Sequence, residues 1–163
     1  MNIHTPCGSQ LNVRLRGRGE PRLLLIHGFG DGSFVWDPIL LNLKHYASAA
    51  LDLRGHGDSQ WDPLQRYSVD DHVEDAAHVL DTLRLEDMVL VGHSLGAEVA
   101  LRLAHRFPIR VRGLVLVDWG PDPNPQSKAL VRDQFSGQGW QYASTSEYAI
   151  WPGCCATSLP QIA

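Results

Sequence analysis

The sequence predicts an α/β domain, in which a mostly parallel sheet carries helices on both faces. Between residues 22 and 118, short apolar runs alternate with segments whose apolar residues have helical spacing. The apolar runs, such as "LLLI" at 23–26, lack polar alternation, which is typical of parallel strands buried on both faces. We expect right-handed crossovers between successive strands.

The first third of the chain is rich in strand patterns. The stretch "QLNVRLRG", residues 10–17, alternates apolar and polar residues like a half-buried strand. The turn residues of "RGRGEPR" then predict a hairpin into the buried strand "RLLLIHG", residues 22–28. A helix is expected within 33–44, with Pro38 tolerated in its first turn, and another buried strand ends near Asp52.

The clearest helix covers residues 68–85. Ser68 is placed to cap it, and the acidic residues of its first turn favour the positive end of the helix dipole. One face is apolar and comprises Val69, Val73, Ala76, Leu80 and Leu83. A strand at 88–92, a helix at 95–107 stopped by Pro108, and a strand at 113–118 complete the alternation.

Composition and charge narrow the function classes. The 163 residues suit one globular domain, with 44% hydrophobic and 20% charged residues. A net charge of −4 argues against nucleic acid or an anionic membrane as a partner. No stretch approaches the roughly 18 apolar residues of a membrane span, and the N-terminus has no secretion signal pattern. We expect no membrane association.

The cysteines and glycine-rich loops predict neither a metal nor an organic cofactor. The three cysteines, Cys7, Cys154 and Cys155, lack the number and spacing of a disulfide framework or a zinc site. The glycine-rich loops match no phosphate-binding fingerprint. We therefore expect a reducing, cytoplasmic location and no cofactor.

The pentapeptide "GHSLG" carries the sharpest chemical signal. Gly92 and Gly96 flank Ser94 at the spacing G-x-S-x-G, between a buried strand and a helix. Glycines at these two positions let the strand and helix backbones pass closely while the serine hydroxyl is exposed on a sharp turn. The N–H of Leu95, at the helix start, then points to where an oxyanion would form. An ordinary strand–turn–helix with a capping serine is the alternative.

Two further loops follow buried strands. In "HGFG", residues 27–30, the N–H of Phe29 is placed to be a second oxyanion donor, and Gly28 permits close approach. We interpret His27 as a structural histidine. In "DLRGHGDS", residues 52–59, Asp52, Arg54 and Asp58 are expected to brace the loop.

These three stretches together resemble the α/β-hydrolase family, in its serine esterase and lipase-like branch, over residues 11–120. The resemblance implies Ser94 as the nucleophile, Phe29 and Leu95 as oxyanion donors, and hydrolysis of an ester or similar acyl bond through an acyl-enzyme. Haloalkane dehalogenases and epoxide hydrolases resemble this branch but use aspartate at the nucleophile position, so serine argues against them.

The resemblance also implies eight strands and a triad in the chain order Ser, Asp or Glu, His. This chain offers patterns for the first six strands only, and no histidine follows His105. Asp118, at the end of the sixth strand, is the candidate acid, although it can instead cap the strand and brace the next loop. His93 should point away from the Ser94 hydroxyl, because neighbours on a strand face opposite sides.

None of the remaining histidines is well placed in the sequence to act as the catalytic base. His56, in a loop on the same side of the sheet, is the best substitute, with a structural loop histidine as the alternative. His72, His78 and His105 are expected on solvated helix surfaces, and His4 and His45 have no motif around them. We therefore expect the base to be absent from this chain.

We expect residues 1–120 to form the N-terminal part of the hydrolase core, 121–151 to begin a cap-like insertion, and 152–163 to be an irregular tail. The abrupt change in pattern near Trp151 suggests a truncated or frame-shifted gene product. The strand at 113–118 would then be an exposed sheet edge, prone to self-association.

The function expected is hydrolysis of a small-molecule ester or acyl substrate, with weak or no activity in this chain. The alternatives are a non-catalytic ligand-binding module and a half-enzyme completed by a partner chain.

Overall fold

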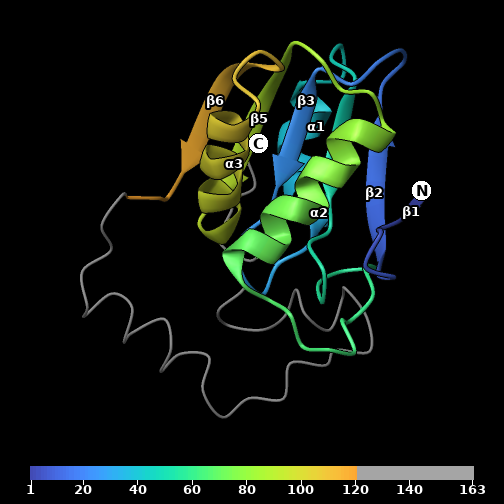
Figure 1. The fold of residues 1–163 in the computed structure, drawn as a ribbon. Helices are drawn as coiled ribbons and strands as arrows, with labels where there is room; N and C mark the ends of the chain where they lie inside the picture. The colour runs from blue at the N-terminus through green and yellow to red at the C-terminus, as the bar shows by residue number, and fades with distance from the viewer. Residues whose placement is uncertain (121–163) are drawn as a thin grey trace. The chain divides into compact units, whose positions relative to one another are not determined.

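The structure is a computed structural model that describes residues 1–120. Residues 1–119 form one compact unit (Figure 1). The predicted cap-like segment at 121–151 and the tail at 152–163 lie outside the described residues, so those boundaries stay predictions.

The described residues form one six-stranded sheet with the strand order β1-β2-β4-β3-β5-β6. Strands β3, β4, β5 and β6 are parallel, whereas β2 runs antiparallel to both β1 and β4. The strand bounds are Asn2–His4 for β1, Gln10–Arg16 for β2, Leu23–Ile26 for β3, Ser48–Leu51 for β4, Met88–His93 for β5 and Val111–Val117 for β6. The mostly parallel α/β sheet predicted from the sequence is confirmed.

Helices cover both faces of the sheet. They are the 3-10 helix η1 (Ser33–Trp36), α1 (Asp37–Asn42), α2 (Val69–Thr82) and α3 (Leu95–Arg106). Figure 1 shows α2 and α3 together on one face, with α1 behind the strands. The core therefore has two layers, one on each side of the sheet.

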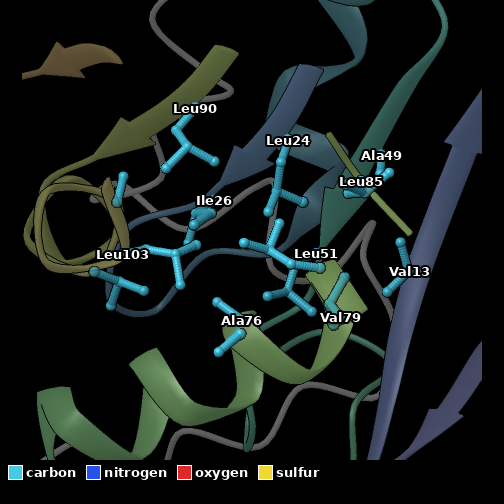
Figure 2. Packing of buried hydrophobic residues seen from close by; sticks show 14 of the residues in the cluster. Val13, Leu24, Ile26, Ala49, Leu51, Ala76, Val79, Leu85, Leu90 and Leu103 are labelled. Carbon is cyan, nitrogen blue, oxygen red and sulfur yellow. The ribbon is translucent and has the colours of Figure 1, made fainter. Parts of the chain in front are cut away.

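Alternate residues of the strands enter these two layers. Figure 2 shows Leu24 and Ile26 of β3 and Leu90 of β5 in the larger layer, against α2 and α3. The intervening Leu25 packs on the other face with Trp36 and Leu40 of η1 and α1. Burial on both faces explains why β3 is apolar throughout.

Two helix predictions are confirmed in detail. Ser68 caps α2 through a reciprocal capping box, in which its side chain accepts from the Asp71 N–H and the Asp71 side chain accepts from the Ser68 N–H. Within the segment 33–44, residues 33–42 form η1 followed by α1, with Pro38 in the first turn of α1.

The predicted hairpin between residues 10–17 and 22–28 is wrong. Strand β4 lies between β2 and β3 and pairs with both. The physical reason is burial: all four residues of β4 are buried, so it takes a central place between them. Strand β1 was not located from the sequence, because three residues are too few to show a periodic pattern.

Candidate active site

Ser94 occupies a sharp turn between β5 and α3. Its backbone has φ 50° and ψ −114°, in the left-handed region that a non-glycine residue seldom enters. Its N–H donates to the carbonyl oxygen of Val117 at 3.0 Å, which fixes the turn to the end of β6. Among the described residues its side chain makes no hydrogen bond and does not cap α3. The hydroxyl is therefore uncommitted at the start of a helix.

The two glycines around Ser94 are required by close backbone contacts. A Cβ on Gly92 would lie 2.3 Å from the carbonyl oxygen of Gly96. A Cβ on Gly96 would lie 2.3 Å from the carbonyl oxygen of Ile26, at the end of β3. The steric reason expected for the G-x-S-x-G spacing is thus present in the structure.

The loop after β3 is held by His27. The ring is fully buried, its Nδ1 lies 2.7 Å from the carbonyl oxygen of Gly28, and its Nε2 accepts the N–H of Leu53 at 3.0 Å. Because Nε2 is an acceptor, Nδ1 carries the proton and donates to Gly28. Burial lowers the pKa of His27 to about 4. His27 is a neutral structural residue, as interpreted from the sequence.

The hydrogen bond from His27 to the Gly28 carbonyl also orients the N–H of Phe29. The carbonyl of Gly28 and the N–H of Phe29 belong to one peptide unit, so a donor on the carbonyl fixes the direction of the N–H. The Phe29 ring itself is 49% exposed. The hydrogen bond from His27 thus orients the N–H of Phe29 through the carbonyl of the same peptide unit.

The loop after β4 is braced from within by two buried charged residues. The Asp52 carboxylate accepts the N–H of Ser33 at 2.5 Å, the Asn12 side-chain amide at 2.8 Å and the N–H of Asp58 at 3.1 Å. Arg54 is also buried. Its guanidinium donates to both carboxylate oxygens of Asp75 in α2, at 2.6 and 2.7 Å. The bracing role expected for this loop is present in the structure, with Asp58 contributing its backbone.

His56 belongs to a cluster of rings between this loop, the loop after β3 and α2. Its ring centroid lies 5.2 Å from that of His27, 5.7 Å from Phe29 and 6.3 Å from His72. His56 Nδ1 lies 3.0 Å from the carbonyl oxygen of Arg54, and burial lowers the pKa of His56.

The expected surface location of His72 is wrong. Its ring is buried, and its Nδ1 has no hydrogen-bond partner within residues 1–120. Burial lowers the pKa of His72 to about 4. Its position on a helix outside the expected apolar stripe suggested a surface residue, but the His56 ring of the loop after β4 lies 6.3 Å from it, between ring centroids. His105 is exposed and His78 half-buried.

His93 lies on the other face of the sheet from the larger core layer, beside two carboxylates. Its Nδ1 is 3.6 Å from Asp31 Oδ2 and its Nε2 is 4.0 Å from Asp118 Oδ2. Asp31 raises the pKa of His93 above its usual value, with a smaller contribution from Asp118. The structure thus brings the predicted Asp118 to His93. Asp31 was missed from the sequence, although it directly follows "HGFG".

The described residues contain no group of three or more histidine, cysteine or acidic side chains able to hold a metal ion. Within the same residues, no helix is long and apolar enough to cross a membrane.

A family profile described as "alpha/beta hydrolase fold" matches residues 21–149, which is most of the chain. This chain belongs to the α/β-hydrolase fold family. The assignment agrees with a solved hydrolase from Pseudomonas aeruginosa, to which the chain is 31% identical with a TM-score of 0.71, over 81% of this chain and 50% of that one.

Two similar proteins, both named as hydrolases or esterases, show which activities occur among the relatives of this chain. A 2-(acetamidomethylene)succinate hydrolase of Mesorhizobium japonicum is 38% identical over 112 residues, covering 68% of this chain and 40% of the relative. An esterase of Mycobacterium tuberculosis is 37% identical over 118 residues, covering 72% and 39%. The chain therefore spans less than half the length of these relatives, and their names support a hydrolase in general terms.

Proposed function

We propose that this chain carries the nucleophile and the oxyanion donors of a serine hydrolase that cleaves ester or similar acyl bonds. The observation that carries the proposal is the backbone of Ser94, held at φ 50° at the start of α3 by the close contacts of Gly92 and Gly96. A left-handed, non-glycine residue stores strain, and such strain is concentrated at functional sites. The hydroxyl it presents makes no competing hydrogen bond among residues 1–120.

In the proposed reaction, Ser94 Oγ attacks the acyl carbon of the substrate while a histidine takes its proton. The carbonyl oxygen becomes an oxyanion, which accepts hydrogen bonds from the N–H groups of Phe29 and Leu95. The first N–H groups of a helix have no partner within the helix, so the N–H of Leu95 is suited to this role. As the intermediate collapses, the histidine gives this proton to the leaving alcohol and an acyl-Ser94 remains, which water then hydrolyses to release the acid and the free serine.

Among residues 1–120, no histidine is hydrogen-bonded to the Ser94 hydroxyl, so none is in place to accept its proton. All eight histidines lie at or before His105. Both nitrogens of His27 are engaged, and His93 faces two carboxylates. We infer that full activity needs a histidine from outside residues 1–163, in a longer chain or a partner chain. Asp118 is proposed either to orient that histidine or to brace the end of β6.

The test is turnover of a short p-nitrophenyl ester together with intact-mass detection of an acyl adduct. We expect weak turnover, and we expect Ser94→Ala to abolish both turnover and the adduct. Ser48→Ala is the matched control, because the Ser48 hydroxyl is buried on β4 without a hydrogen-bond partner in the described residues. Activity that survives in Ser94→Ala would remove Ser94 from its proposed role.

A ligand-binding module without chemistry is the second candidate, favoured by the absence of a histidine hydrogen-bonded to Ser94 within residues 1–120. An ester or acid that raises the melting temperature equally in the native chain and in Ser94→Ala, without being consumed, would support it.

A further inference from the structure

His93 connects three strand ends that the proposed function depends on. It is the last residue of β5 and directly precedes Ser94. One of its neighbouring carboxylates, Asp31, comes from the loop after β3, and the other, Asp118, directly follows β6. The loop that holds Asp31 also carries Phe29. The strand that Asp118 follows ends at Val117, whose carbonyl oxygen accepts the N–H of Ser94.

The His93 ring also lies against the backbone of the Phe29 loop. A Cβ on Gly28 would lie 2.7 Å from His93 Nδ1 and 3.4 Å from Asp31 Oδ2. A side chain at position 28 would therefore displace the ring from the carboxylate. The sheet geometry adds to this contact, because Ile26 of β3 is paired in register with Gly92 of β5. The ring is largely enclosed, with 21% of its side chain exposed.

We propose that His93 is a positioning residue: as an imidazolium between Asp31 and Asp118, it ties the Phe29 loop and the end of β6 to the turn that carries Ser94. The proposal rests on the proposed function, because it is the N–H of Phe29 and the hydroxyl of Ser94 that are held in register. A protonated ring has two N–H donors and a positive charge, whereas the neutral ring has one donor and no charge. Only the protonated ring can attract both carboxylates at once.

The two carboxylates contribute unequally. Asp31 is buried and nearer, whereas the Asp118 side chain is 88% exposed and its attraction is screened by water. This difference predicts that Asp31 contributes more than Asp118 to raising the pKa of His93. The direction agrees with the raised pKa of His93, for which Asp31 is the main cause.

The test is an NMR titration of the histidine rings and of the Phe29 backbone amide between pH 5 and 9. We expect the His93 ring to titrate above 6.5, and the Phe29 amide resonance to show a step at the same midpoint. His56, whose ring contacts Phe29, has a lowered pKa, so any step it causes falls on the other side of 6.5. In His93→Gln the upper step of the Phe29 amide should disappear.

Carboxylate variants provide the controls. Asp31→Asn should lower the His93 midpoint strongly, and Asp118→Asn, at an exposed site, should lower it by a smaller shift. Asp87→Asn removes an exposed carboxylate at the opposite end of β5, about 20 Å away along the strand, and should leave the midpoint unchanged.

A His93 midpoint at or below 6.5, or a Phe29 amide without the matching step, would overturn the proposal even if His93→Gln did not fold. None of these measurements requires turnover. If Ser94→Ala keeps the turnover and the adduct while the linked titration is present, the proposed function is wrong, whereas the link between His93 and its two carboxylates stands.

Discussion

Gly96 and Ile26 approach so closely that no side chain fits between them: a Cβ on Gly96 would lie 2.3 Å from the Ile26 carbonyl oxygen and 2.5 Å from that of His27. The first turn of α3 therefore rests on the end of β3, immediately before the loop that carries Phe29. This contact places the two proposed oxyanion donors, the N–H groups of Leu95 and Phe29, at the same end of the sheet, beyond the carboxyl ends of the strands.

Gly96→Ala should lower the free energy of unfolding by about 3 kcal/mol, because backbone rather than a flexible side chain lies in the way of the new methyl group. Urea unfolding followed by circular dichroism measures it. Gly113→Ala is the control, since the atoms nearest to a Cβ there belong to the Val89 side chain, at an ordinary 3.4 Å or more, and it should be neutral or slightly stabilising. Equal effects of the two changes would contradict the contact described above.

Arg54→Met should lower the free energy of unfolding by roughly 3–5 kcal/mol, because it leaves the buried Asp75 carboxylate without its partner. The same substitution at Arg22, which pairs with Asp87 at 3.5 Å with both side chains at least half exposed, should change it by less than about 1 kcal/mol. Chemical unfolding of both variants gives the comparison. A small effect of Arg54→Met would show that the loop after β4 does not depend on this ion pair.

Acid should destabilise the fold through its buried histidines. His27 and His72 have a pKa of about 4 in the folded state, against an ordinary value of 6.5. Between these limits the unfolded chain binds more protons, so stability is complete above pH 6.5 and is lost as the pH falls towards 4. Two such groups give a slope of up to about 2.7 kcal/mol per pH unit. Unfolding curves measured at intervals from pH 7.5 to 4.5 test this.

His72→Leu should flatten that slope by about half and raise the melting temperature at pH 5, because it removes one buried titrating group whose Nδ1 has no partner in the described part of the chain. An unchanged slope in this variant would exclude His72 as a source of the acid sensitivity.

The edge of the sheet should promote self-association. Strand β6 ends the strand order of the described sheet, with Val115 46% and Val117 40% exposed. We expect sedimentation velocity to detect concentration-dependent species, and Val115→Lys to reduce them. Leu41→Lys, at a site on α1 that is 67% exposed, is the matched control and should not. A monomer at all concentrations would contradict the prediction.

Local patterns sufficed for the helices and most strands, because their signals lie within a few residues of each other. The cap at Ser68 and the apolar face of α2 are read directly from spacing. The hairpin prediction failed because strand partners are chosen by long-range burial, and nothing near residues 10–28 records that β4 lies between β2 and β3. The same limit applies to His72, whose burial depends on a loop from a different part of the chain.

The sequence alone determined the fold class, the family resemblance and the position of Ser94 between two glycines, since each rests on residue types at fixed short spacing. Only the tertiary structure decided that His27 orients the Phe29 peptide and that Asp31 and Asp118 meet at His93. These residues come from strand ends far apart in the chain. The parallel sheet brings them together at the carboxyl ends of its strands. The distances between their side chains are set by packing, which no local pattern encodes.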